Sequence, residues 1–243
     1  MCIKAVEIDT LNYKYDDGTV ALDSISLTVN KGESLGIIGA NGAGKSTLVN
    51  HLNGYFLPQS GLVKIHNIEL SRKTQEQVRQ LVGVVFQVAD DQLFMPRIYD
   101  DIAFGPRNLG LNGKALEEAV EDVLRKLGLW ELRDRAPSRL SAGQKRFCSF
   151  ATVLVMQPSI IVMDEPTSDL DPRHRRQLIN FIRSFNATKI TVSHDLDFIW
   201  DICDRVVIMF QGKIVVDGLT KDLLNSKALL EKYELELPLR FQK

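Results

Sequence analysis

The stretch SLGIIGANGAGKSTL, residues 34–48, decides how this chain folds. Its first five residues favour a buried strand, residues 39–47 fit the phosphate-binding pattern GxxxxGK[ST], and Leu48–Leu52 favours a helix. Such a loop turns backbone N–H groups toward phosphate oxygens, and the helix adds its positive end. A glycine turn that merely caps a helix is the alternative, but the strand-then-helix setting favours a nucleotide site. That site is predicted to comprise Gly39, Asn41, Gly42, Gly44 and Thr47, with Lys45 on the outer phosphates and Ser46 on Mg²⁺.

On either side of this loop, short β-branched runs alternate with longer helical patterns, which predicts an α/β fold with a parallel sheet covered by helices. An antiparallel hairpin beside that sheet is predicted from two alternating stretches around the turn at residues 16–18. The hairpin strands are Val6–Leu11 and Ala21–Val29. The other predicted strands are Ser34–Ile38, Gly61–Ile65, Val82–Phe86, Ile160–Met163, Lys189–Val192, Arg205–Phe210 and Lys213–Asp217.

The middle of the chain lacks strand patterns and predicts helices. Lys114–Leu127 and Gly143–Val155 place apolar residues three and four apart, as amphipathic helices do. We therefore expect residues 1–99 and 157–220 to form the nucleotide-binding α/β core with its antiparallel β subdomain. Residues 100–156 would form an inserted helical subdomain, and residues 221–243 a short helix over 221–230 followed by a charged tail.

Composition narrows the class of protein. The 243 residues are 44% hydrophobic and 25% charged, which is typical of a globular chain. With 30 Lys and Arg against 31 Asp and Glu, the net charge of -1 supplies no basic field for nucleic acid. The start, MCIKAVEIDT, does not have the layout of a secretory signal, so a cytosolic chain is expected. Three scattered cysteines (Cys2, Cys148, Cys203) favour reduced thiols, and four scattered histidines predict no metal cluster.

A second chemical signal is the apolar run Ile160–Met163, which ends in Asp164 and Glu165. Asp164 can hold Mg²⁺ through water, and Glu165 can polarise an attacking water. Taken alone, such a strand often ends only in solvated acids. The phosphate-binding loop upstream favours the metal interpretation, and the second carboxylate favours hydrolysis, which indicates an ATPase.

The sequence Leu140-Ser141-Ala142-Gly143-Gln144 stands before a long amphipathic helix, and Ser141 and Gln144 have the spacing of a capping box. An ordinary capped helix would explain this motif by itself. The order of motifs is more specific: the phosphate-binding loop, Gln87, LSAGQ, the Asp-Glu strand, Ser168–Asp171 and His194. This order resembles the ATP-binding-cassette (ABC) ATPases over about the first 220 residues.

The resemblance implies a site shared between two subunits, which sandwich two ATP molecules. Ser141, Gly143 and Gln144 would serve the partner's ATP, Glu165 would be the general base, and His194 would contact the γ-phosphate. A lone histidine after a strand is more often an ordinary surface or core residue, but here the other motifs support the role. The resemblance also gives roles to Gln87 and Asp171: Gln87 would sense Mg²⁺ and the transport partner, and Asp171 would link the two ATP sites. Tyr15 would stack on adenine, and Tyr13 is the competing candidate for this role.

Two residues depart from the family pattern. Ala142 stands where glycine is usual, so a methyl group is expected close to the path of the partner's phosphate. Asp169 is unusual for its loop, and the sequence offers no explanation for its charge.

The segment Val85–Gly110 resembles more narrowly the ATPases of energy-coupling-factor (ECF) importers. The resemblance implies that Asp90–Phe94 receive helices of a membrane subunit. Leu93, Phe94 and Met95 are expected to be exposed there. The short tail around residues 234–238 is similar to the cobalt/nickel type, with a vitamin importer as the alternative. The resemblance implies a second ATPase subunit, which would form either a homodimer or a heterodimer with a paralogue. It also implies two membrane partners, a coupling subunit and a substrate-binding subunit. The chain would then work at the cytoplasmic face of the membrane.

The sequence argues against two other classes of nucleotide-binding protein. A soluble ABC ATPase of DNA repair or translation usually carries two cassettes or a long coiled coil, and 243 residues have no room for either. A P-loop kinase or GTPase has no use for LSAGQ, and the guanine-reading NKxD is absent because Asn30-Lys31 is followed by Gly32-Glu33.

Overall fold

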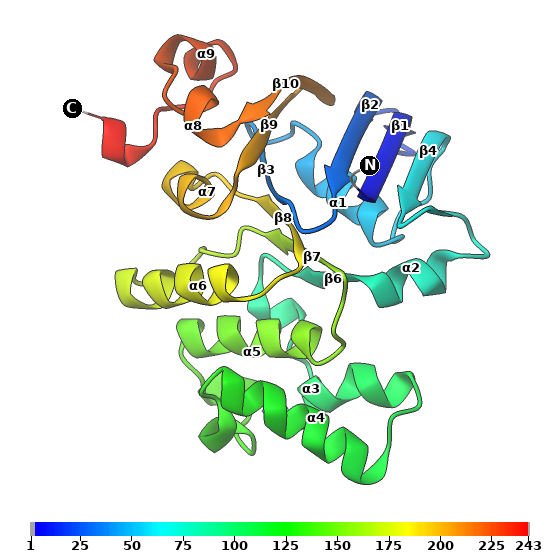
Figure 1. Cartoon of the computed structure of the whole chain (residues 1–243), viewed down its shortest axis with the longest axis vertical. Helices are drawn as coiled ribbons and strands as arrows, with labels where there is room; N and C mark the ends of the chain where they lie inside the picture. Colours follow the sequence, from blue (N-terminus) through cyan, green and yellow to red (C-terminus); the bar gives the residue numbers. More distant parts are fainter. Residues whose placement is uncertain (1–2, 243) are drawn as a thin grey trace.

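The strand that leads into the phosphate-binding loop, β3 (Ser34–Ile38), is fully buried within a six-stranded sheet. The computed structural model describes residues 3–242, and the order of this sheet is β10-β9-β3-β8-β7-β6 (Figure 1). Strands β6 (Val82–Val85), β7 (Ile160–Asp164), β8 (Thr188–Val192) and β9 (Arg205–Phe210) run parallel to β3, whereas β10 (Lys213–Leu219) pairs antiparallel with β9. Strands β3 and β7 are mostly apolar because both faces of the sheet are covered. The predicted α/β fold is confirmed.

The second sheet is antiparallel and has the order β2-β1-β4-β5. It contains the predicted hairpin, β1 (Lys4–Lys14) with β2 (Val20–Asn30), and adds β4 (Ser60–Ile65) and β5 (Ile68–Glu69). The run Gly61–Ile65, which was predicted alongside the strands of the parallel sheet, therefore belongs here. Its inner residues Val63 and Ile65 are buried and alternate with Leu62 and Lys64, which are not, as expected of a strand with only one covered face.

Nine α-helices occur among residues 3–242, and the two amphipathic helices predicted for the middle of the chain are confirmed as α4 and α5. The single helix expected over 221–230 is instead two short helices. The Asn225 side chain donates a hydrogen bond to the Lys221 carbonyl near the end of the first helix, and Ser226, which precedes the second, has an extended backbone. The helices are α1 (Lys45–Leu52), α2 (Gln75–Leu81), α3 (Ile98–Asn108), α4 (Gly113–Lys126), α5 (Ala142–Leu154), α6 (Pro172–Ser184), α7 (Leu196–Ile202), α8 (Thr220–Leu223) and α9 (Lys227–Lys232).

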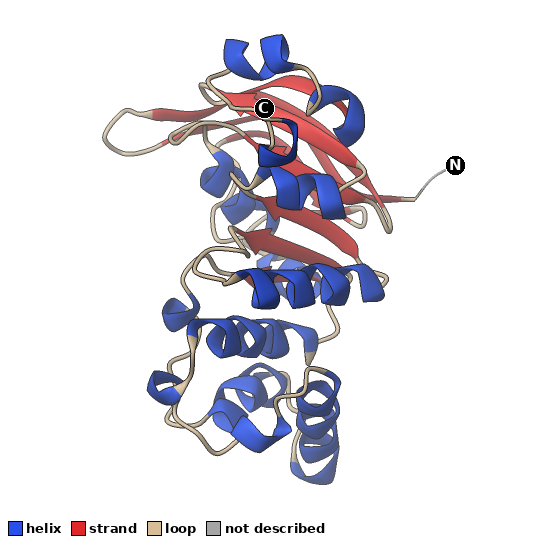
Figure 2. Ribbon diagram, turned by 90° about the vertical axis from the view of Figure 1, so that its left-hand side faces the viewer, coloured by secondary structure: helices blue, strands red, loops and turns tan. Residues whose placement is uncertain are grey.

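Helices α3, α4 and α5 gather at one end of the molecule, opposite α8 and α9, and Figure 2 shows no strand at that end. They share a core that includes Leu116, Val120 and Leu124. Leu93 and Ile98 also pack in this core, although both precede the predicted boundary at residue 100. The division of the chain into domains stays a prediction.

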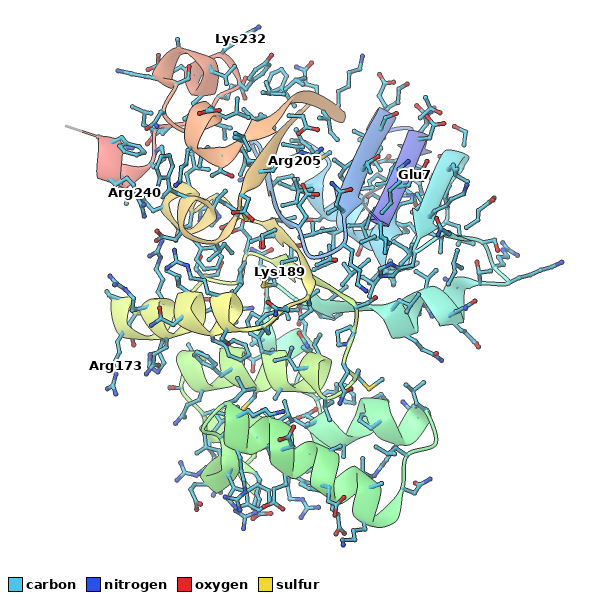
Figure 3. All side chains as sticks on the ribbon, viewed as in Figure 1. Glu7, Arg173, Lys189, Arg205, Lys232 and Arg240 are labelled. Atoms are coloured by element: carbon cyan, nitrogen blue, oxygen red, sulfur yellow. The ribbon has the colours of Figure 1, made fainter. Side chains whose placement is uncertain are left out.

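The two sheets are joined by Arg205, at the start of β9 (Figure 3). Its Nη1 donates to the Thr28 carbonyl of β2 at 2.9 Å and to Glu33 Oε1 at 2.8 Å, while Nε contacts Asp217 Oδ1 of β10. A planar guanidinium suits this position because its donors reach several acceptors at once. The contacts hold the antiparallel sheet against the edge of the six-stranded sheet.

Cys148 and Cys203 are free and buried, whereas Cys2 lies outside the described residues. Within residues 3–242, no three His, Cys, Asp or Glu side chains are grouped so that they could hold a metal ion. In the same part of the chain, we find no helix long and apolar enough to cross a membrane.

Candidate functional site

A cleft of about 660 Å³ lies beside the phosphate-binding loop. Open α/β sheets bind ligands outside the carboxyl ends of their parallel strands, and the loops after β3, β7 and β8 all reach this cleft. The structure thereby brings together most of the predicted site residues. The lining residues are Tyr15, Thr19, Val20, Ala21, Asn41, Gly42, Ala43, Gly44, Lys45, Ser46, Thr47, Gln87, Asp164, Glu165, Val192 and His194.

The phosphate-binding loop needs glycine for steric reasons at its two ends. A Cβ on Gly39 would lie 2.2 Å from the Met209 carbonyl oxygen, and one on Gly44 would lie 2.4 Å from that of Ala21. Gly44 is also the N-cap of α1, with φ of 98° and no side chain to cap the helix. The first N–H groups of α1 therefore have no side-chain acceptor and suit an anion.

Lys45 is held at the mouth of the same loop. Its Nζ donates to the carbonyls of Gly39 at 2.7 Å and Ala40 at 2.9 Å. Burial lowers the pKa of Lys45, while the nearby charges of Glu165 and Asp164 act in the opposite direction. An ammonium that has lost part of its hydration, beside uncapped N–H groups, fits a polyphosphate.

Asp164 and Ser46 face each other across the cleft, with Ser46 Oγ 3.3 Å from Asp164 Oδ2. Burial raises the pKa of Asp164, and the charge of Glu165 raises it further, against smaller effects of Ser46 and Lys45. A divalent cation would relieve this crowding of negative charge. A carboxylate and a hydroxyl, with the Gln87 side chain on the same cleft, are the hard oxygen donors that Mg²⁺ takes, so the residues fit this ion.

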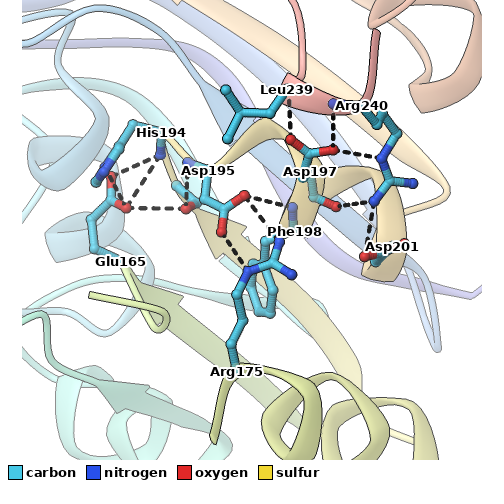
Figure 4. A network of polar contacts seen from close by, with 10 residues as sticks. Glu165, Arg175, His194, Asp195, Asp197, Phe198, Asp201, Leu239 and Arg240 are labelled. Carbon is cyan, nitrogen blue, oxygen red and sulfur yellow. Dashed lines mark hydrogen bonds and ion pairs between the residues drawn. The ribbon is translucent and has the colours of Figure 1, made fainter. Parts of the chain in front are cut away.

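Glu165 is buried at the end of β7 and is fixed by several hydrogen bonds (Figure 4). Ser193 Oγ donates to its Oε2 at 3.0 Å, and the backbone N–H of His194 donates to Oε1, also at 3.0 Å. The His194 ring lies with Nδ1 2.8 Å from Oε2. The φ of Glu165 is 45°, an uncommon backbone conformation for a side chain of this size. Together these contacts set the direction of a carboxylate suited to proton abstraction.

Sequence reasoning missed two groups that hold this carboxylate and its loop. Ser193 was not singled out, although it lies directly before His194. Asp195 follows, caps α7 by accepting from the Phe198 N–H at 2.8 Å, and pairs with Arg175 of α6 at 2.9 Å (Figure 4). Burial opposes ionisation of Asp195, but the Arg175 and Phe198 hydrogen bonds outweigh it and lower the pKa. A polar triplet, Ser-His-Asp, directly after a buried strand was the available signal.

The two tyrosine candidates occupy different environments. Tyr15 lines the cleft, is 37% exposed, and its hydroxyl lies 2.8 Å from Thr47 Oγ1. Tyr13 instead stacks on Phe56, with ring centroids 4.8 Å apart, and is not among the residues that line the cleft. The geometry therefore favours Tyr15 over Tyr13 for contact with a base.

Ser141, Gly143 and Gln144 do not line this cleft. The predicted capping box is confirmed: the Gln144 N–H donates to Ser141 Oγ at 3.3 Å, and the Ser141 N–H donates to Gln144 Oε1 at 3.0 Å. The buried Gly143 packs against the His174 ring, where a Cβ would lie 2.5 Å from Cδ2.

Asp171 also lies outside the cleft, at the start of α6. It caps that helix by accepting from the His174 N–H, and its other oxygen lies 2.6 Å from His174 Nδ1. His174 thereby links the loop of Asp171 to the helix that begins at Ala142, whose side chain is exposed.

The predicted docking segment is partly corrected. Leu93 was expected to be exposed but is only 5% exposed, because it packs into the core of α3, α4 and α5. Met95 was also expected to be exposed but is half-buried. Phe94 is 61% exposed and meets the ring of Phe104 edge-on at 5.1 Å. Asp101 fixes this segment by accepting the N–H groups of Phe94 and Met95, both at 2.9 Å.

Comparison with known proteins places these features in a family. Residues 22–168 match the family model for ABC transporters. The chain is 48% identical to a putative ABC transporter ATP-binding protein of Geobacter sulfurreducens, over 98% of this chain and 95% of that protein. It is 42% identical to the energy-coupling factor transporter ATP-binding protein EcfA of Carboxydothermus hydrogenoformans, over 97% and 88%. The structure of cbiO1 from Clostridium perfringens, part of the ABC transporter complex cbiONQ, superposes with a TM-score of 0.84 at 35% identity, over 97% and 96%.

Proposed function

Because the chain belongs to the ATP-binding subunits of ABC transporters, we propose that it hydrolyses ATP in this cleft, with Mg²⁺, to power an ECF-type importer. The grouping of Lys45, Asp164 and Glu165 around one cleft is the observation that carries this function. The test is MgATP hydrolysis by the purified chain, reconstituted with its membrane partners, with and without EDTA. Hydrolysis that persisted without divalent cation, or an inactive reconstituted complex, would refute the proposal.

The chain's own residues supply the chemistry. The N–H groups of the loop and Lys45 Nζ bind the phosphates and stabilise the negative charge that develops on them. Asp164 and Ser46 hold the cation, and Mg²⁺ would neutralise phosphate charge when bound. Glu165, directed by Ser193 and the His194 backbone, accepts the proton of the attacking water. Tyr15 would stack on adenine.

The second half of the site is proposed to come from another subunit. Ser141, Gly143 and Gln144 stand at the N-terminus of α5, a 13-residue helix whose positive end suits a γ-phosphate. Because none of the three lines the cleft of its own chain, they would bind the nucleotide of the partner, and reciprocally. A homodimer is favoured, and a paralogue is the alternative, which cross-linking of the complex would distinguish.

The membrane subunit is proposed to dock on the surface formed by Phe94 and Phe104, where Phe94 belongs to the segment that follows Gln87 in the sequence. Exposed aromatic side chains next to acidic residues are typical of partner interfaces. Asp90, which follows Gln87 closely, is fixed by Lys145 of α5 at 2.6 Å, so a docked helix would contact a segment tied to both Gln87 and α5. This surface would place the chain at the cytoplasmic face of the membrane.

The docking surface is tested with Phe94→Ala plus Phe104→Ala. The double variant should retain ATP affinity within about twofold while its copurification with the membrane subunit is lost, since truncating a good anchor costs about 2 kcal/mol. Leu219→Ala removes an equally exposed apolar side chain elsewhere and should leave assembly intact. A double variant that still assembles and transports would place the docking surface elsewhere.

The cargo is proposed to be cobalt or nickel ions, with a vitamin such as biotin as the alternative. The support is the similarity to cbiO1, which is part of the ABC transporter complex cbiONQ. Uptake of radiolabelled nickel, cobalt and biotin by the reconstituted transporter distinguishes the two, and uptake of biotin alone would overturn the metal assignment.

A further inference from the structure

Arg146 is a nearly fully buried arginine in α5, with 3% of its surface exposed. Its Nη1 donates to the Phe86 carbonyl and its Nη2 to the Gln87 carbonyl, both at 2.6 Å. These carbonyls belong to the loop after β6 that carries Gln87 into the cleft. One guanidinium of α5 therefore holds this loop by its backbone, independently of the side chains there.

The electrostatic surroundings of Arg146 are unusual for a structural arginine. Within residues 3–242 it forms no ion pair, and its buried Nε has no hydrogen-bond partner. Burial lowers the pKa of Arg146, and the negative charge of Asp169 opposes this effect. A buried cation without close neutralisation is costly compared with an apolar side chain of similar volume. Stability alone therefore does not account for it.

Asp169, which the sequence left unexplained, lies in the loop after Glu165 with φ of 62°. It is exposed, and its negative charge acts on the buried guanidinium. The hydrogen bonds of Arg146 join two segments of one chain, α5 and the Gln87 loop.

We propose that Arg146 is a positioning residue that couples the Gln87 loop to the N-terminal end of α5. The proposal rests on the proposed ATPase function. Arg146 lies two residues beyond Gln144 on the same helix, so the turn meant for the partner's nucleotide and the loop that senses this chain's own nucleotide move together. Binding in one site is then transmitted to the other through one side chain.

A double-mutant cycle tests this coupling, with kcat and KM for ATP measured as functions of Mg²⁺ concentration. Arg146→Gln should lower kcat about tenfold, the effect of losing a charged hydrogen bond, with KM within about threefold. Arg146→Lys, which keeps the charge, should recover part of kcat. In a Gln87→Ala background, Arg146→Gln should add less than about twofold, because both changes remove the same positioning.

The matched control is Arg183→Gln, which removes an arginine of α6 that also donates to a backbone carbonyl, that of Asp201, away from the cleft. It should leave kcat within about twofold. Losses from Arg146→Gln and Gln87→Ala that multiply would overturn the proposal. Since wild-type hydrolysis is measured in the same assay, that result would leave the ATPase function standing, whereas an inactive wild type would refute the function itself.

If thermal unfolding shows that Arg146→Gln does not fold, Arg146→Lys decides, measured alone and with Gln87→Ala. Lysine keeps the positive charge but cannot hold the two carbonyls with a planar pair of donors, so kcat should fall about threefold. This loss should be absent when Gln87 is also changed to Ala. An unchanged kcat in folded Arg146→Lys, or an equal loss in both backgrounds, would overturn the positioning role of Arg146.

Discussion

Helices α1 and α5 both begin at predicted phosphate-binding motifs, but their N-termini are capped differently. Helix α1 starts after Gly44 and has no side-chain cap, whereas α5 starts after Ser141 with a complete capping box. The first motif lines a cleft together with carboxylates of its own chain, and the second lies outside that cleft.

Under the proposed function, this difference decides which half of the site a chain could complete alone. The uncapped α1 has free N–H donors, so it is ready for an anion as folded. At α5, Ser141 Oγ already accepts from the Gln144 N–H, and this internal contact keeps the turn ordered. One chain would then contain a binding half that acts by itself and a second half that requires another subunit.

The largest expected effect is that of Glu165→Gln, which separates binding from hydrolysis. Removing a general base should lower kcat by about 10²–10⁴-fold while MgATP still binds. With hydrolysis blocked, both halves should remain engaged, and size-exclusion chromatography should show a dimer in MgATP. Glu118→Gln, on exposed α4, serves as the control. Normal turnover, or a monomer at high protein concentration, would contradict the shared site.

Lys45→Ala tests the half of the site formed by the phosphate-binding loop, which is proposed to bind ATP without a second subunit. Loss of a charged hydrogen bond to phosphate should weaken MgATP binding about 100-fold in a fluorescence titration of the isolated chain. Lys114→Ala removes an exposed lysine of α4 and should have no effect beyond about twofold. Unchanged affinity in Lys45→Ala would show that the cleft is not the nucleotide site.

Ser141→Ala tests the half of the site that is proposed to bind the nucleotide of the partner subunit. It should leave ATP affinity of the isolated chain unchanged but lower kcat about tenfold, because the hydroxyl is needed only in the dimer. Loss of the cap itself should cost about 1 kcal/mol of stability, measured by thermal unfolding, and Ser141→Thr should preserve both properties. If Ser141→Ala lost ATP affinity as a monomer, the turn would serve its own chain.

The smallest expected effect is that of Tyr15→Ala, which should weaken binding of ATP about fivefold because base stacking is lost. Tyr15→Phe keeps the ring and removes only the contact with Thr47, so affinity should stay within about twofold. Equal losses in both variants would assign the effect to the hydroxyl rather than to stacking.

Most of the fold was predictable because the hydrophobic pattern is local. The run Ser34–Ile38 has five consecutive buried residues, and its strand was predicted with the observed bounds. The partner of Gly61–Ile65 was not predictable in the same way, because pairing with β1 depends on contacts far apart in the sequence. The break between α8 and α9 was missed because the extended backbone of Ser226 between them has no motif of its own.

The site was predicted best where a motif is contiguous, as at residues 39–47. It was predicted poorly where tertiary packing decides exposure: Leu93 looked like a surface anchor beside Phe94, but the core of α3, α4 and α5 covers it. Ser193 and Arg146 carry no motif of their own, and their roles appear only when strands and helices bring them to Glu165 and to the Gln87 loop.

Lys45 satisfies two of its three donors within its own loop, on the carbonyls of Gly39 and Ala40. If Lys45 binds phosphate as proposed, these carbonyls would compete for the same ammonium, so part of the gain on binding ATP would be offset by the contacts that the lysine gives up. After hydrolysis the same carbonyls would be available to the ammonium again, which would favour departure of the product. The loop would therefore limit affinity and favour turnover, and a lysine with no internal partners would bind nucleotide more tightly and release it more slowly.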